Sequence, residues 1–238
     1  MSRNYSTIYL EWVRSAHEAF KRRDYESAAR FLKYVTIYYG TINDVSNRRK
    51  YAIKTGDCYL QAAKETEREN SPLKTILLCI KAANSFREGG REESAELCDS
   101  LIQKYCSSMW KGEPIKNKGE AHDLKTVGDY FVKNNDYQRA IECYHIAAEK
   151  ASGEEKLSLC GGLYRDMGDC HHNLKDFERA AMNYAKAADM YLECQEYFEA
   201  AWHYCESCFL FIYVGKSGAA SIVARKAGSA CEEGHIPV

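Results

Sequence analysis

A repeat of 40 residues is the feature that most constrains the fold of this chain. Residues 127–148, VGDYFVKNNDYQRAIECYHIAA, return as residues 167–188, MGDCHHNLKDFERAAMNYAKAA, and more weakly around residues 204–230. The positions that match are mostly small or aromatic: Gly128/Gly168, Ala140/Ala180, Tyr144/Tyr184 and Ala147/Ala187. Small residues allow two helices to approach closely, and aromatic rings fill the space that remains. The repeat therefore predicts stacked helical hairpins and indicates packing rather than catalysis.

The repeat contains a shorter step of 20 residues. The pattern Asp176-Phe177-x-x-Ala180-Ala181 returns as Glu196-Tyr197-x-x-Ala200-Ala201. Consecutive helices therefore resemble one another, and each repeat is a pair of helices of about 17 residues, or ~26 Å in length.

Helix boundaries follow from capping residues and glycines. Asp24, Asp136 and Asp176 are predicted N-caps, and Ser71-Pro72 predicts a cap followed by proline at the first helical position. Gly40, Gly89-Gly90, Gly153 and Gly215 are predicted helix ends. The predicted helices are residues 4–22, 24–39, 43–69, 72–88, 91–106, 119–134, 136–151, 155–173, 176–193, 196–214 and 217–232.

These elements predict an all-α fold, a right-handed solenoid of antiparallel hairpins with about 11 or 12 helices. The scarcity of proline, with three in 238 residues, agrees with this fold class. Residues 107–118 contain Gly112 and Pro114 and are predicted to be a flexible connector within a single domain, residues 1–238.

The spacing of Gly128, Phe131, Ala140, Tyr144 and Ala147 resembles the tetratricopeptide repeat. That repeat is 34 residues long, whereas the unit here is longer. The longer, mutually similar helices resemble the soluble NSF attachment proteins, in stretches such as DFERAAMNYAKAADMYLECQEYFEAAWHY (residues 176–204) and PLKTILLCIKAANSFREGGREESAELC (residues 72–98). The resemblance implies a cytoplasmic adaptor without enzymatic activity that binds proteins. In its more specific form it implies an adaptor that binds SNARE-like coiled coils in vesicle fusion.

The tetratricopeptide resemblance also implies which residues bind a partner, because that family uses the inner face of the first helix of each hairpin. The corresponding residues here are Lys125, Asp129, Lys133, Arg165, Asp169, His172 and Asn173. Family members that clamp a peptide carboxylate place Asn four residues after Lys, where this chain has Asp129. A carboxylate at that position would repel the peptide terminus, so we expect a folded or helical partner. Ion pairs within one helix remain an alternative role for these charges.

Cysteine and histidine provide the alternative of a metalloprotein or thiol enzyme. His203, Cys205 and Cys208 have the residue types of a zinc site, which Cys194 or the run Cys170-His171-His172 would complete. Cys208 also falls on the small packing position of the repeat, and neighbouring residues on a helix point in different directions. We therefore expect buried thiols, with no metal and no catalytic residue.

Composition favours neither nucleic acid nor nucleotide binding. The chain has 33 Lys and Arg against 34 Asp and Glu, and it contains no phosphate-binding glycine loop, so we expect no cofactor. The short basic clusters 21–23 and 48–50 are expected to be solvated, with an anionic partner or peripheral membrane contact as the alternative. The absence of an apolar leader and of any long apolar run favours a cytoplasmic protein without membrane insertion.

Overall fold

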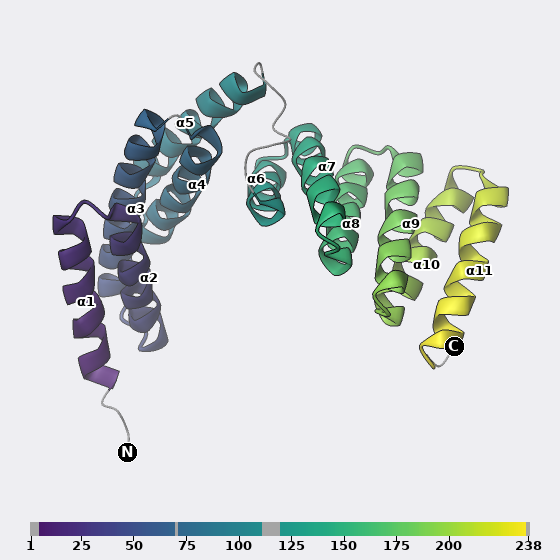
Figure 1. Ribbon diagram of the computed structural model, residues 1–238, viewed down its shortest axis with the longest axis horizontal. Helices are drawn as coiled ribbons and strands as arrows, with labels where there is room; N and C mark the ends of the chain where they lie inside the picture. Colours follow the sequence, from purple (N-terminus) through teal and green to yellow (C-terminus); the bar gives the residue numbers. More distant parts are fainter. Residues whose placement is uncertain (1–4, 70, 111–119, 237–238) are drawn as a thin grey trace. The chain divides into compact units, whose positions relative to one another are not determined.

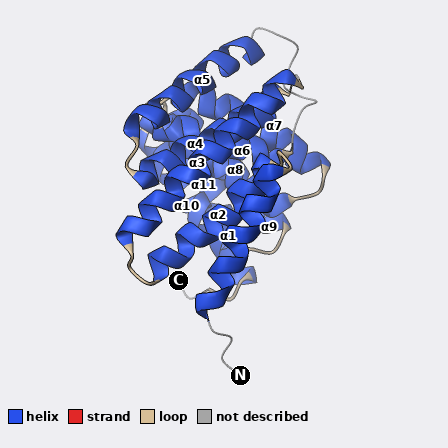
Figure 2. Cartoon of the chain, turned by 90° about the vertical axis from the view of Figure 1, so that its left-hand side faces the viewer, coloured by secondary structure: helices blue, strands red, loops and turns tan. Residues whose placement is uncertain are grey.

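The computed structural model describes the fold of residues 5–69, 71–110 and 120–236, and all regular structure within these ranges is helical (Figure 2). The helices form two compact units, residues 1–118 and 119–238. In the first unit they are α1 (Tyr5–Lys21), α2 (Tyr25–Thr41), α3 (Val45–Arg68), α4 (Pro72–Gly89) and α5 (Glu92–Trp110). In the second they are α6 (Ala121–Lys133), α7 (Tyr137–Gly153), α8 (Leu157–Asn173), α9 (Phe177–Glu193), α10 (Tyr197–Tyr213) and α11 (Ser217–Glu233).

The helices agree with the sequence prediction to within two residues at every described end but one. The exception is α5, which was predicted to end at residue 106 and continues to Trp110. Residues 107–110 of the predicted connector are therefore helical, and residues 111–118 lie outside the described part of the chain. The expected helix end at Gly40 is also wrong, because α2 continues through this glycine to Thr41.

The 20-residue step has a direct structural cause in the second unit. Helices α7 to α11 each contain 17 residues and are followed by turns of three residues. The middle residue of each of these turns has a positive φ, between 52° and 78°, at Glu155, Lys175, Gln195, Gly215 and His235, and Asn135 repeats this in the turn after α6. One left-handed residue at the same point of every turn closes the helix and starts the next one in the same way.

The capping prediction holds for the aspartates. The side chains of Asp24, Asp136 and Asp176 each accept a hydrogen bond from the backbone N–H three residues later. Asp44 does the same at the start of α3, which the sequence prediction missed. Ser71 precedes Pro72 at the start of α4 as expected, although its side chain makes no capping bond.

Consecutive helices of the second unit pack against each other in two layers. In Figure 1, α7, α9 and α11 form the nearer layer, and the fainter α6, α8 and α10 lie behind them. The buried core contains the repeated small and aromatic positions that the sequence singled out: Ala140, Ala147, Ala180, Ala187, Tyr144 and Tyr184. The fold is thus an α-solenoid, as predicted.

In the first unit, α1 to α5 pack in chain order around a comparable core. An ion-pair cluster connects three of these helices. Glu88 of α4 contacts Lys33 Nζ of α2 at 2.7 Å and Arg48 Nη2 of α3 at 3.0 Å. These contacts join helices that are up to 55 residues apart in the sequence.

Candidate functional site

The predicted binding residues lie on α6 and α8, and two of them, Lys125 and Arg165, pair with Asp166, a carboxylate that the sequence analysis did not single out. Lys125 Nζ lies 2.8 Å from Asp129 Oδ1 and 2.9 Å from Asp166 Oδ2. Arg165 donates to the other oxygen of Asp166, from Nε at 3.1 Å and from Nη2 at 2.7 Å. Asp166 is 8% exposed, so this cluster joins α6 to α8 through a nearly buried carboxylate.

The electrostatics of Lys125 reflect this pairing. Partial burial alone would lower its pKa, but hydrogen bonds to Asp129 and Asp166 outweigh the burial and raise the pKa. Lys125 is therefore a charged residue that already has two anionic partners. The alternative of an ion pair within one helix is confirmed for Lys125 and Asp129.

Asp129 and Asp169 have a second structural contact, with tyrosines of the following helices. Tyr144 donates its hydroxyl to Asp129 Oδ1 at 2.7 Å, and Tyr184 donates to Asp169 Oδ1 at 2.6 Å. The next helix pair repeats the contact, from the Tyr204 hydroxyl to Asp189 Oδ1. We call these three contacts the tyrosine–aspartate ladder.

Each tyrosine ring of the first two contacts also lies against the glycine that precedes the aspartate. A Cβ atom on Gly128 would lie 2.4 Å from Tyr144 Cε1, and one on Gly168 would lie 2.6 Å from Tyr184 Cε1. Burial and the hydrogen bond to Asp169 raise the pKa of Tyr184, so its hydroxyl stays protonated and acts as a donor.

The remaining predicted residues lie at the surface. Lys133, His172 and Asn173 are exposed, and the Asn173 side chain donates to the carbonyl oxygen of Asp169 at 2.8 Å. The ring of His172 contacts the Phe177 ring edge-on at a centroid distance of 5.3 Å. His172 also connects the predicted set to the pocket described next.

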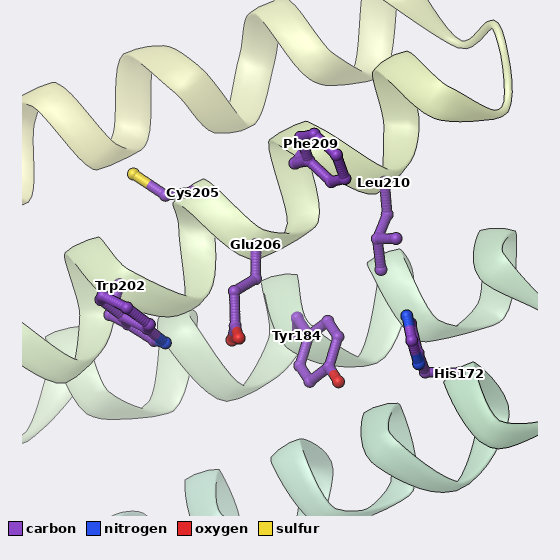
Figure 3. Close-up of a pocket in the computed structure, with 7 residues that line it drawn as sticks. All are labelled: His172, Tyr184, Trp202, Cys205, Glu206, Phe209 and Leu210. Atoms are coloured by element: carbon purple, nitrogen blue, oxygen red, sulfur yellow. The ribbon is translucent and has the colours of Figure 1, made fainter.

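A groove of about 420 Å³ lies where α10 meets α8 and α9 (Figure 3). Glu206 extends from α10 toward Tyr184 of α9, and His172 of α8 extends toward Leu210 of α10, whereas Cys205 points away from them. The residues that line the groove are His172, Tyr184, Trp202, Cys205, Glu206, Phe209 and Leu210. Except for His172, the sequence analysis did not assign these residues to a binding surface.

The repeat itself contained a signal for this groove. Two of the predicted residues, Arg165 and Asp169, correspond after one further step of 40 to Cys205 and Phe209. The face that is charged on α6 and α8 therefore becomes apolar on α10. Phe209 is 69% exposed and Trp202 57% exposed, which is unusual for aromatic rings of this size.

The metal and thiol candidates do not form one cluster. His203 is 7% exposed and its ring stacks on those of Tyr184 and Tyr191. Cys205 on the same helix is exposed, so the expectation of a buried thiol is wrong there, because this position lines the groove of α10. Within the described ranges, no group of three or more His, Cys, Asp or Glu side chains is arranged to hold a metal ion. Cys170 is buried, as expected, and burial raises the pKa of its thiol to about 12, which disfavours a reactive thiolate.

A second groove, of about 390 Å³, lies between α1 and α3 of the first unit. Val13, His17 and Phe20 of α1 line it together with Tyr51 and Lys54 of α3. Like the groove at α10, this second groove involves the first helices of two successive hairpins, here α1 and α3.

Comparison with known proteins places the chain in a family. The sequence model described as "Soluble NSF attachment protein, SNAP" matches residues 47–195. The crystal structure of BtubC (BKLC) from P. vanneervenii is similar in fold, with a TM-score of 0.58 at 13% identity, covering 100% of this chain and 94% of that one. The TPR2AB domain of yeast Sti1 in complex with pHSP90 aligns with a TM-score of 0.25 at 11% identity, covering 94% of this chain and 99% of that one.

No curated protein matches the chain in sequence. No helix in the described part of the chain is long and apolar enough to cross a membrane. The family match covers well over half of the 238 residues and includes the whole of α8, most of the tyrosine–aspartate ladder and the ion-pair cluster of Lys125. The chain is therefore a member of the soluble NSF attachment protein (SNAP) family.

Proposed function

We propose that this protein is a cytoplasmic, non-enzymatic adaptor that binds protein partners across the face formed by α6, α8 and α10. The observation that carries the proposal is the groove at α10, with Trp202 and Phe209 exposed at its edge. Apolar surface of this kind on a repeat protein marks an interaction site, because exposed aromatic rings gain free energy when a partner covers them.

The charges on α6 and α8 support a folded or helical partner over a peptide terminus. A carboxylate clamp needs a cation that is free to bind the ligand, and Lys125 is held by Asp129 and Asp166. Lys133, Asp169, His172 and Asn173 are the predicted residues that remain exposed, and His172 lines the groove itself. They are suited to the polar edge of a protein interface whose apolar centre is on α10.

Quantitative capture from native lysate tests the proposal. The tagged full-length protein is compared with a Trp202→Glu/Phe209→Glu variant and with a Met182→Glu/Ile222→Glu control. The control residues are also exposed apolar side chains, but they lie on α9 and α11 of the other layer. We expect mass spectrometry to identify proteins that the first variant loses and the control retains. Equal capture by all three proteins would contradict the proposal.

Family membership favours one more specific candidate, a SNAP-type adaptor that binds SNARE-like coiled coils in vesicle fusion. This candidate predicts binding to a purified four-helix SNARE bundle at micromolar concentration, measured by fluorescence anisotropy. Binding that the Trp202→Glu/Phe209→Glu variant abolishes would support it. Absence of binding by the wild-type protein would remove this candidate and leave the general adaptor function standing.

A further inference from the structure

The groove at α10 has the shape and charge for one kind of ligand. We propose that it binds an amphipathic α-helix of a partner protein, whose apolar ridge enters the groove and whose Lys or Arg side chains meet Glu206. The inference rests on the proposed function and specifies the partner for that face.

The apolar residues of α10 form one continuous stripe. Phe198, Trp202 and Phe209 are more than half exposed, and their spacing of four and seven residues places them on the same side of the helix. Ile212 and Tyr213, also more than half exposed, lie on either side of this line at the next turn. Trp202 and Phe209 are two helical turns apart, about 10.5 Å along the axis. A partner helix with apolar residues at i, i+3 or i+4, and i+7 matches this length.

The stripe includes the position at which the ladder stops. Residue 209 corresponds to Asp129, Asp169 and Asp189, each of which accepts a hydrogen bond from a tyrosine 15 residues later. In α10 the acid is replaced by Phe209, and the tyrosine position in α11 is occupied by Ala224. Both members of the ladder contact are thus replaced at this step, the acid by an aromatic ring and the tyrosine by a small side chain. Phe209, 69% exposed, stands at the point where the ladder stops.

The charge of α10 specifies a basic partner. This helix contains Glu199 and Glu206 and no Lys or Arg. Glu206 lines the groove and has one oxygen, Oε2, 2.7 Å from His203 Nδ1, and the seven lining residues named above include no Lys or Arg. A carboxylate inside an apolar groove favours a cation on the ligand and disfavours an anionic membrane surface.

A selection experiment with the full-length protein tests this inference. The probe is a phage-displayed library of random peptides about 16 residues long, enough for roughly four helical turns, selected on the wild-type chain. We expect enriched peptides to form amphipathic helices with Lys or Arg beside the apolar ridge. Fluorescence anisotropy of a synthetic enriched peptide should show that Phe209→Glu weakens binding by about tenfold or more, whereas Met182→Glu leaves it unchanged.

Glu206 provides the test of charge. Glu206→Lys should weaken binding of the basic peptide. The same variant should strengthen binding of a second peptide in which the Lys and Arg residues are replaced by Glu. The conservative Glu206→Gln variant keeps a hydrogen-bonding group for His203 and should reduce the preference for the basic peptide without reversing it. Enrichment of acidic or extended peptides, no enrichment, or equal binding by Phe209→Glu would overturn the inference.

Two other occupants of the groove have their own readouts. A wild-type dimer in sedimentation velocity that Phe209→Glu dissociates would show that a second copy binds there. Sedimentation with phosphatidylserine vesicles that depends on Phe209 would show a membrane contact. Either result overturns the helix inference. The proposed adaptor function fails separately, when lysate capture does not depend on Trp202 and Phe209.

Discussion

Gly168 and Tyr184 show how single residues set the distance between α8 and α9. The ring of Tyr184 occupies the volume that a side chain at position 168 would need, and its hydroxyl donates to the neighbouring Asp169. Gly128, Asp129 and Tyr144 repeat this arrangement between α6 and α7. Packing and hydrogen bonding therefore depend on the same tyrosine in each of these hairpins.

Substitution of Gly168 by Ala should destabilise the protein. The new Cβ would lie 2.6 Å from Tyr184 Cε1, so the ring or the helices must move, at a cost of about 1–3 kcal/mol in the free energy of unfolding. Gly228→Ala in α11 is the matched control, because a Cβ there meets no atom within 4 Å and should stabilise the helix by ~0.5–1 kcal/mol. Urea denaturation measures the free energy of unfolding of both variants. An equal change in the two would contradict the close packing of Tyr184 against Gly168.

Removal of one ladder hydroxyl should have a smaller effect. Tyr184→Phe leaves the ring in place and removes the hydrogen bond to Asp169, with an expected loss of about 1 kcal/mol. Tyr137→Phe serves as control, because its hydroxyl bonds to the nearby Asn135 at the exposed start of α7, and we expect almost no change. A loss of the same size in both variants would argue against a special role for the ladder.

The sequence predicted the small and aromatic residues of the core but not the ladder. Gly128, Tyr144 and their counterparts repeat visibly, and their residue types indicate close packing. The hydrogen bond from Tyr144 to Asp129 joins residues 15 positions apart on different helices, so it depends on how the hairpin closes. The prediction treated Asp129 and Asp169 only as surface charges of single helices, where their use by a partner was the natural hypothesis.

At the scale of elements, periodicity and caps predicted the helices well because the same 17-residue helix and three-residue turn recur. The end of α5 was missed because the connector was predicted from Gly112 and Pro114, and these strong helix breakers lie after Trp110, where the helix ends. The apolar run CFLFIYVG, residues 208–215 at the end of α10, could not be assigned to a surface, since sequence alone does not show which side of a helix its neighbours cover.

The ion pairs of Glu88 predict a pH dependence for the packing of α2, α3 and α4. Burial by itself would raise the pKa of Glu88, but hydrogen bonds from Lys33 and Arg48 outweigh it and lower the pKa below its ordinary value of 4.5. The unfolded chain therefore takes up this proton at a higher pH than the folded chain. The stability that Glu88 contributes at neutral pH is lost as the pH falls through 4.5 and below.

Glu88→Gln should therefore lower the free energy of unfolding at pH 7 by about 1 kcal/mol, and this deficit relative to the wild type should shrink at acid pH. Urea denaturation at about pH 7 and about pH 3.5, on either side of the ordinary glutamate pKa, measures the difference. Glu18→Gln, at an exposed position of α1, should have the same free energy of unfolding as the wild type at both pH values. A deficit of Glu88→Gln that persists unchanged at the lower pH would contradict the assignment.

At the scale of the whole molecule, the single domain predicted for residues 1–238 remains a prediction, and the structure describes two compact units. A single domain should unfold in one calorimetric transition, with equal calorimetric and van't Hoff enthalpies. Gly168→Ala should then move the whole transition to lower temperature. Two transitions, of which Gly168→Ala moves only one, would show two domains.

The central claim is that partners bind the face formed by α6, α8 and α10, and site-specific photo-crosslinking tests it most directly. A photoreactive phenylalanine is introduced singly at Asn173 and Trp202 on that face, and at Met182 and Ile222 on the layer of α9 and α11. We predict crosslinks to a partner protein from positions 173 and 202 and none from positions 182 and 222. Crosslinks from positions 182 or 222 alone would place the binding surface on the other layer and contradict the claim.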